Sequence, residues 1–173
     1  MLNAGEKMFS YRFEGYWKDV GTISSLLEAN MDLLGVAPNF ELDDSDHVIH
    51  SRSPLSPPAY VEGEVINSIV ANGCEIEGKI VNSVIGTNCV VGKGAVVCDS
   101  VLMGNITVKQ GATINYSIID EEVTIGENAV IGAVKEEASK VESKTAGITV
   151  LGRGITVRNG GKVSAGEIVD KDV

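Results

Sequence analysis

Two groups of residues near the start of the chain are the candidates for chemistry. One is the Trp-Lys-Asp run inside FEGYWKDVGT, in which Trp17 and Asp19 flank a lysine. The other is the pair of histidines, His47 and His50, because imidazole is the most common general base in enzymes. Each group also has an ordinary interpretation. The run can be plain surface, with Asp19 stabilising the N-terminus of a following helix, and the histidines can be exposed linker residues.

Most of the remaining chain carries a six-residue period that neither a helix nor an alternating strand shows. Between Ile85 and Gly104 an aliphatic residue recurs at every sixth position, usually followed by glycine. This period is typical of a parallel β-helix, in which each hexapeptide forms a short strand and a bend, and three hexapeptides complete a triangular coil. The residues expected to point inward are Ile85, Val91, Val97 and Met103, together with the small residues Cys89, Ala95 and Val101.

The inward register continues towards the C-terminus with a few shorter steps. Steps of five residues lead to Val108 and to Ile119, and the step of six returns after a break. A β-sandwich would instead alternate with period two and place turns about every 8 to 12 residues. The further inward positions are Val108, Ile114, Ile119, Ile125 and Ile131, the small residues Ala112, Val123 and Ala129, and then Leu151, Val157, Val163 and Val169.

These repeats predict a mainly β domain over residues 61–173. Its first part, 61–84, keeps the aliphatic and glycine content with irregular steps. Residues 133–147 include the charged stretch AVKEEASKVESK without a hexapeptide, and we expect them to form a solvated loop inserted between coils. Residues 36–60 are polar and punctuated by proline, and we expect a linker with an acidic cluster at Asp43, Asp44 and Asp46.

A helix is predicted between the Trp-Lys-Asp run and the linker. Thr22 can cap its N-terminus together with Ser25, and Gly35 followed by Pro38 ends it. The first 21 residues hold most of the aromatic side chains and have no core of their own, so residues 1–35 are expected to be the end of a larger domain. The apolar stripe of the helix consists of Ile23, Leu26, Leu27, Met31 and Leu34.

Composition narrows the function classes. The 173-residue chain has a net charge of −10, which argues against nucleic-acid binding because that normally depends on lysine and arginine. No apolar run approaches the roughly 18 residues that span a membrane, and the first residues lack the pattern of a signal peptide. Three cysteines without a CxxC pair are expected to be reduced packing residues of a cytoplasmic protein.

The stretch YRFEGYWKDVGTISSLLEANMDLL resembles the end of the catalytic domain of the sugar-nucleotide pyrophosphorylases, most closely the bacterial glucose-1-phosphate adenylyltransferases. In that family a Y-W-[RK]-D-V-G-T run precedes a helix that ends in N-[ML]-D-L, and the C-terminal domain is a left-handed β-helix. The resemblance therefore implies a single-stranded left-handed parallel β-helix, preceded by a helical remnant of the nucleotidyltransferase domain.

The resemblance also implies roles for two residues. The family's aspartate helps to hold the catalytic Mg²⁺ and its tryptophan lies in the glucose 1-phosphate pocket, roles that fall on Asp19 and Trp17. The implied reaction makes ADP-glucose and pyrophosphate from ATP and glucose 1-phosphate for glycogen biosynthesis. The glycine-rich nucleotide loop and the second metal-binding carboxylate of the family are missing. We therefore expect a C-terminal fragment that holds no catalytic residues of its own and is inactive alone.

Assembly and regulation follow from the same resemblance. Family members form tetramers and respond to anionic effectors, which implies a homo-oligomer, or a tetramer shared with a paralogous subunit. Anionic effectors need cationic partners, although scattered solvated charges are the alternative interpretation of the candidates. These are Arg153, Arg158 and Lys162, with Lys93 and Lys109 further back.

Three other functions stay open. One is a non-catalytic regulatory subunit of the same family, and another is a pyrophosphorylase for a different sugar or nucleotide. The third is a hexapeptide-repeat acyltransferase, which would need a histidine base on a coil, whereas residues 54–173 contain no histidine.

Overall fold

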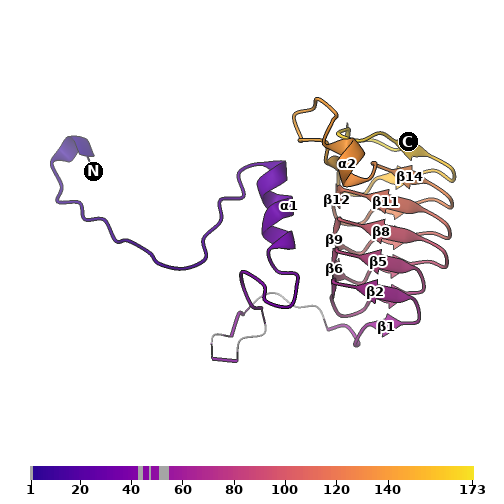
Figure 1. Cartoon of the computed structure of the whole chain (residues 1–173), viewed down its shortest axis with the longest axis horizontal. Coiled ribbons are helices and arrows are strands. Elements are labelled where there is room, and N and C mark those ends of the chain that lie inside the picture. Colours follow the sequence, from indigo (N-terminus) through magenta and orange to yellow (C-terminus); the bar gives the residue numbers. More distant parts are fainter. Residues whose placement is uncertain (1, 43–44, 47, 51–54) are drawn as a thin grey trace.

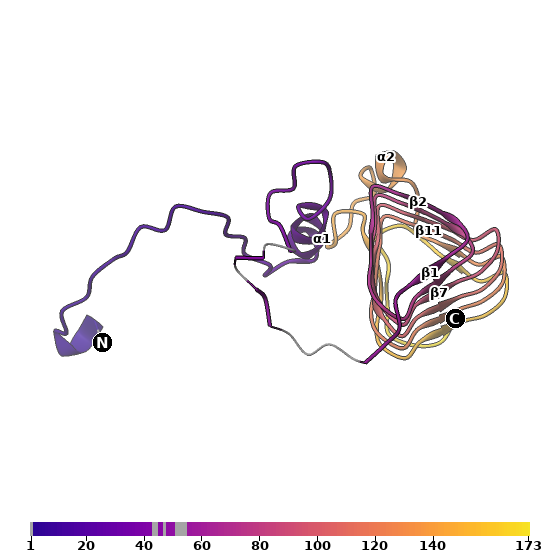
Figure 2. The same ribbon diagram turned by 90° about the horizontal axis from the view of Figure 1, so that it is seen from below.

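The computed structural model of this chain describes residues 2–42, 45–46, 48–50 and 55–173. Figure 1 shows a stack of coils, a helix beside the stack and an extended N-terminal segment that leads away from both. Viewed along the stack, the coils are triangular (Figure 2). From β1 onwards the chain passes through three sheets in a left-handed sense. The predicted left-handed parallel β-helix is confirmed.

Within the described residues the strands form three parallel sheets of six strands, and each strand pairs with the coils before and after it. The first sheet contains β1 Tyr60–Val61, β4 Glu75–Ile76, β7 Val90–Val91, β10 Thr107–Val108, β13 Thr124–Ile125 and β16 Thr156–Val157. The second contains β2 Glu64–Ile66, β5 Lys79–Val81, β8 Val96–Cys98, β11 Thr113–Asn115, β14 Val130–Ile131 and β17 Lys162–Val163. The third contains β3 Ile69–Val70, β6 Val84–Thr87, β9 Val101–Gly104, β12 Ser117–Ile119, β15 Thr149–Leu151 and β18 Ile168–Val169.

In the described part of the chain, three helical segments accompany the strands: η1 Leu2–Ala4, α1 Ile23–Met31 and α2 Lys135–Ala138. The predicted cap of α1 is confirmed, because the Thr22 hydroxyl accepts from the backbone N–H of Ser25 and the Ser25 hydroxyl accepts from that of Thr22. This reciprocal pair satisfies two N–H groups that a helix start otherwise leaves unpaired. Among the described residues, no helix has the length and apolar character needed to cross a lipid bilayer.

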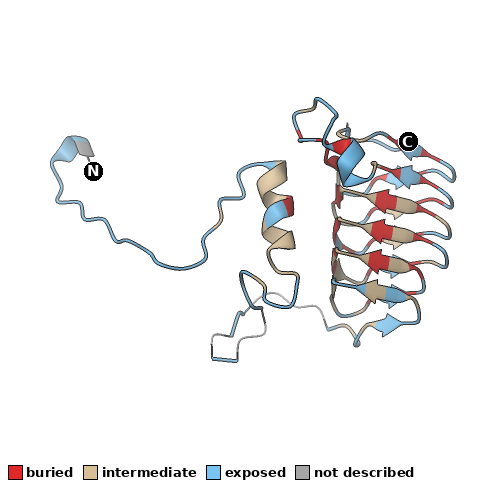
Figure 3. Cartoon of the chain, in the orientation of Figure 1, coloured by how far each residue is buried: buried red, intermediate tan, exposed pale blue. Residues whose placement is uncertain are grey.

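The core is a set of aliphatic columns that run through the stack. One residue of each strand points inward and lies on its counterparts in the neighbouring coils, as Ile85, Leu102 and Ile119 do in the third sheet. Figure 3 shows these buried positions recurring from coil to coil. Complete burial of one such side chain contributes roughly 1.5–3 kcal/mol. The cysteines are free, and Cys74 and Cys89 pack in this core as expected.

The predicted inward register is wrong at one corner, where two residues are misplaced. Met103 is 37% exposed, whereas Leu102 is 1% exposed and occupies the inward column. Val101, also expected inside, belongs to a second buried cluster under α1 rather than to the core of the coils. The step of five residues therefore lies between Val97 and Leu102, one corner earlier than the sequence pattern suggested.

A short corner between the second and third sheets causes the five-residue step. Asp99 there adopts a left-handed conformation with φ of 49°, which turns the chain within fewer residues. The next residue, Ser100, donates to the Cys98 carbonyl at 2.6 Å and accepts from the backbone N–H of Ser117 at 3.1 Å. The spacing between such serines in the middle coils is 17 residues. Each serine thus satisfies backbone groups of the buried corner and ties one coil to the next.

The inserted segment after β14 is more ordered than a solvated loop. It contains α2, whose Ala138 is completely buried. The Thr145 hydroxyl donates to the Gly166 carbonyl of a later coil at 3.2 Å. Gly147 has φ of +82°, and a Cβ atom there would meet the Ala138 carbonyl oxygen. The insertion therefore folds back onto the stack, while its charged residues stay exposed.

The corrected register predicts unequal costs for two neighbouring truncations. Leu102→Ala should destabilise the 173-residue chain by about 2–5 kcal/mol, because it leaves a cavity in a closed column. Met103→Ala is the matched control and should cost less than about 1 kcal/mol. Urea denaturation followed by circular dichroism measures both. Equal costs, or a larger cost at Met103, would contradict the register.

Candidate functional site

The segment that carries Trp17 and Asp19 runs beside α1. Trp17 is 75% exposed, and the Asp19 carboxylate accepts a hydrogen bond from the Gly21 N–H at 3.0 Å. Asp19 therefore turns the chain just before the helix, while Thr22 provides the cap itself. A carboxylate has about four lone-pair positions, so one backbone contact leaves Asp19 able to accept a further ligand.

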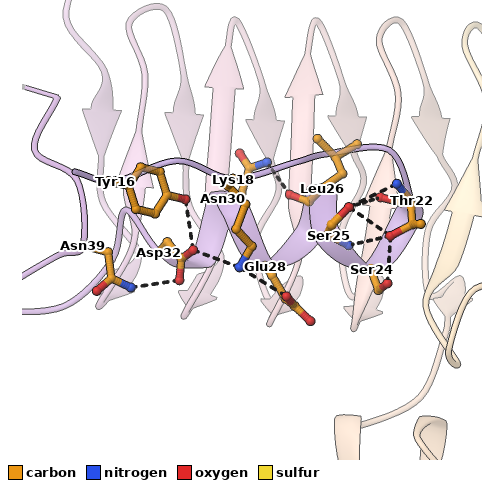
Figure 4. A network of polar contacts seen from close by, with 10 residues as sticks. All are labelled: Tyr16, Lys18, Thr22, Ser24, Ser25, Leu26, Glu28, Asn30, Asp32 and Asn39. Carbon is orange, nitrogen blue, oxygen red and sulfur yellow. Dashed lines mark hydrogen bonds and ion pairs between the residues drawn. The ribbon is translucent and has the colours of Figure 1, made fainter. Parts of the chain in front are cut away.

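The Asp32 carboxylate makes most of the polar contacts that hold this segment against the helix. Asp32 follows the last residue of α1, and its Oδ2 accepts from the Tyr16 hydroxyl at 3.0 Å and from Lys18 Nζ at 3.1 Å. Its Oδ1 accepts from the Asn39 amide at 3.0 Å. Lys18 is also paired with Glu28 at 3.2 Å. Figure 4 shows Tyr16, Lys18 and Asn39 converging on Asp32 at the end of the helix, and Glu28 beside Lys18.

The charges of this network reinforce one another. The hydrogen bond from Lys18 is the main cause that holds the pKa of Asp32 below its ordinary value, and Tyr16 and Asn39 add to it. The same contact, followed by that with Glu28, raises the pKa of Lys18. Partial loss of water, followed by the hydrogen bond to Asp32, raises the pKa of Tyr16. The Tyr16 ring lies 5.8 Å from that of Phe40, which brings the linker into the same contact.

Helix α1 is fixed on the outside of the third sheet. We call the outward aliphatic residues of that sheet the outer ladder; in register they are Ile69, Val84, Val101, Ile118, Val150 and Ile168. Leu27 is buried against Val101 and Ile118, and Ile148 belongs to the same cluster. Of the predicted apolar stripe, Ile23, Leu26, Leu27 and Met31 belong to this cluster. Leu34 does not, because α1 ends at Met31 and not at the predicted Gly35.

A groove of about 410 Å³ lies beside this contact, where the side chains of α1 meet those of the short corners. Lys18 and Lys135 line it together with Asp99 and Tyr116, and Lys135 Nζ lies 5.8 Å from the centre of the Tyr116 ring. Tyr116 adopts φ of 44° at a corner position that asparagine or aspartate fills in earlier coils. Three carboxylates and two lysines line the groove, so it is not a cationic site for an anion.

The predicted effector cations are not brought together in one place. Arg153 lies between β15 and β16 and forms an ion pair with Glu121 of the preceding coil. Arg158 follows β16 at the next corner, and Lys162 lies on β17. All three are exposed. They lie on two different corners and on a sheet face, and their role in effector binding stays a prediction, as does that of Lys93 and Lys109.

His50 does not form part of this site. His47 lies outside the described residues, and His50 is exposed in the linker. In the part of the chain that the structure describes, no three His, Cys, Asp or Glu side chains converge as ligands of a metal ion. Mg²⁺ commonly uses only one or two carboxylates together with substrate phosphates, so Asp19 fits a shared site to which other parts of a protein contribute.

Sequence reasoning missed Asp32, Tyr16 and Lys18. The available signal was the alternation along the segment, which places Tyr16 and Lys18 on one side and Trp17 and Asp19 on the other. It could not identify Asp32 as their partner, because that contact joins residues 14 and 16 positions apart. The outer ladder had a signal too, since aliphatic pairs such as Val101-Leu102 place one residue inside the coil and one outside.

The triangular stack of short parallel strands defines a hexapeptide-repeat protein. The profile of the GlmU-like C-terminal hexapeptide family matches residues 57–170, and the chain belongs to this family. The profile of the nucleotidyl transferase family matches residues 1–35. The second match covers the Trp-Lys-Asp run and α1.

Curated relatives match over the last three fifths of the chain. A glucose-1-phosphate adenylyltransferase of Clostridium perfringens (strain SM101 / Type A) is 42% identical over 104 residues, which are 59% of this chain and 27% of that protein. The enzyme of the same name from Clostridium botulinum (strain Eklund 17B / Type B) is 44% identical over 103 residues, 58% of this chain and 27% of that protein. The matched part spans about a quarter of these relatives.

Solved structures show weaker similarity. A mutant perosamine N-acetyltransferase from Caulobacter crescentus, crystallised with CoA and GDP-perosamine, is 16% identical. It aligns with a TM-score of 0.43 over 69% of this chain and 47% of that one. A likeness at this level carries no argument about function.

The Asp32 network predicts a defined pH dependence. A carboxylate with a lowered pKa contributes stability above the ordinary value of about 3.9 and loses it as the pH falls towards the lowered value. The Tyr16 ring resonances of the 173-residue chain should therefore stay constant from pH 7 to about pH 4 and change only below it. Lys18→Met should move the midpoint upward, because it removes the main cause of the shift. NMR titration measures both. A wild-type transition centred above pH 4, or an unchanged midpoint in the variant, would contradict the network.

Proposed function

We propose that this chain is the C-terminal part of a glucose-1-phosphate adenylyltransferase, which makes ADP-glucose and pyrophosphate from ATP and glucose 1-phosphate for glycogen biosynthesis. The observation that carries the proposal is the exposed pair Trp17 and Asp19 on a segment anchored to α1, which in turn rests on the β-helix. The similarity of 42–44% to enzymes of that name supports the same assignment.

In this proposal two side chains face the reactants. The indole of Trp17 forms a flat apolar wall against one face of the sugar ring of glucose 1-phosphate. The carboxylate of Asp19 supplies a hard oxygen ligand to Mg²⁺, while phosphate oxygens supply others. A Mg²⁺ ion held there would neutralise the negative charge of the reacting phosphates. The nucleotide pocket itself would come from the part of the nucleotidyltransferase domain that lies outside this sequence.

The β-helix in this proposal is a rigid platform for assembly and regulation in the cytoplasm. Its outer faces carry aliphatic side chains that remain partly open to solvent, such as Ile66, Val90 and Val130 with 37–43% exposure. Aliphatic faces of this kind favour contact with a second copy. We therefore propose a homo-oligomer, with a tetramer as the expected assembly, either alone or with a paralogous subunit.

The first test concerns the two proposed site residues in the longer protein that carries this chain, here called the whole protein. Asp19→Asn should lower ADP-glucose formation by about 100-fold at a fixed Mg²⁺ concentration, because the ion loses one of few protein ligands. Trp17→Ala should raise the KM for glucose 1-phosphate by about 10-fold. Asp170→Asn, an exposed position of the last coil, is the matched control.

The 173-residue chain alone should form no ADP-glucose from ATP, glucose 1-phosphate and Mg²⁺. Robust turnover by this chain would show that the pocket is complete without further residues. Unchanged kinetics of both site variants in the whole protein would remove Trp17 and Asp19 from the site.

The second test concerns the proposed effector residues. Arg158→Glu in the whole protein should weaken the response to sugar-phosphate effectors by about 10-fold, because charge reversal repels a phosphate. Arg153→Glu should act less strongly, since Arg153 is already paired with Glu121. Lys171→Glu in the exposed tail is the control. Activation curves measured with all three variants test whether the arginines bind the effector. Three identical curves would exclude Arg153 and Arg158 from the effector site.

A further inference from the structure

The segment before α1 divides its side chains between two directions. Tyr16 and Lys18 both reach the same oxygen of Asp32, although they are two positions apart in the chain. Adjacent side chains of an extended chain point to opposite sides. Fixing Tyr16 and Lys18 on the helix therefore leaves Trp17 and Asp19 on the side away from it. The 75% exposure of Trp17 agrees with this division.

Asp32 stands at an unfavourable place for a negative charge. It follows the last residue of α1 as the C-cap, with its N–H bonded to the carbonyl of Glu28 at 2.9 Å. The C-terminal end of a helix carries partial negative charge and favours cations. Helix capping does not account for a carboxylate here. The three donors that converge on it do account for it, because together they supply a cation and two neutral hydrogen bonds.

The position of Asp32 is set by the β-helix. Leu27 lies five residues before Asp32, within the same helix, and is buried against Val101 and Ile118 of the outer ladder. The Asp32 side chain is 22% exposed and that of Lys18 is 28% exposed, so their contact is partly shielded from water. A continuous series of contacts thus joins the coil stack to α1, to Asp32 and to the segment of Trp17.

We propose that Asp32 is a positioning residue for the reaction: by holding Tyr16 and Lys18 on α1, it fixes the backbone from which Trp17 and Asp19 reach the substrate and its metal ion. This inference rests on the proposed function. Asp32 itself contacts neither reactant. Removing the Asp32 carboxylate leaves Trp17 and Asp19 themselves unchanged but no longer fixes the segment that carries them. Binding of glucose 1-phosphate therefore weakens while the fold remains stable.

The test uses two preparations and one set of variants. In the 173-residue chain, the single tryptophan makes fluorescence anisotropy a direct report on the segment. Asp32→Asn and Lys18→Met should lower the Trp17 anisotropy, whereas Lys18→Arg, which keeps the charge, should preserve it. Asp170→Asn is the matched control for loss of a carboxylate. The melting temperature of each variant shows whether the fold is intact.

The kinetic arm uses the whole protein with the same variants. Asp32→Asn and Lys18→Met should raise the KM for glucose 1-phosphate and the Mg²⁺ concentration for half-maximal rate by about 10-fold, while kcat changes less than about threefold. Lys18→Arg should restore both values to near wild type. A purely structural role of Asp32 would lower the melting temperature and the amount of active enzyme without this separation of KM from kcat.

The outcomes separate this inference from the proposed function. Unchanged anisotropy in Asp32→Asn, or an unchanged KM in an active enzyme, would overturn Asp32 as a positioning residue. A wild-type whole protein that forms no ADP-glucose would overturn the proposed function and the kinetic half of the inference. The anisotropy comparison would still confirm or overturn the anchoring of the segment in that case.

Discussion

Each coil of this β-helix buries its aliphatic side chains only where the next coil places its own residues directly on them. The contacts along the columns of Ile85, Leu102 and Ile119 are therefore made between residues distant in sequence, and the corners must deliver every strand at the correct height. The serines after the left-handed corner residues perform this task, because each of them bonds to its own coil and to the next. Core packing and corner hydrogen bonding thus depend on one common register.

The same register builds the surface on which the candidate site rests. A stack that aligns its inward residues also aligns the residues beside them, and this produces the outer ladder on the third sheet. A nine-residue helix is too short to be stable by itself in water. Leu27 therefore depends on Val101 and Ile118 for its burial, and the network at Asp32 depends on the helix. The geometry of the segment around Trp17 therefore depends on the alignment of the coils.

Periodicity predicted the fold because the β-helix repeats one local unit, so that the same signal appears many times along the chain. Periodicity assigned Met103 instead of Leu102 to the inward position, because a glycine follows Met103 as it follows other inward residues. The left-handed turn at Asp99, which shortens the step, has only a weak sequence signal. The helix cap at Thr22 was predictable because capping is local. The partnership of Asp32 with Tyr16 and Lys18 was not, since it depends on how a folded segment lies against a helix.

At the corner after β14, extra residues are inserted without changing how the coils align in the stack. The inserted residues leave at Ile131 and return at Thr149, yet Ser117 pairs with Thr149 in the same way as its own coil pairs with the one before. Segments of other lengths can therefore occupy this position without disturbing the columns. Since the insertion also supplies Lys135 to the groove beside α1, the chemistry of that groove can be altered by exchanging one peripheral segment while the scaffold stays constant.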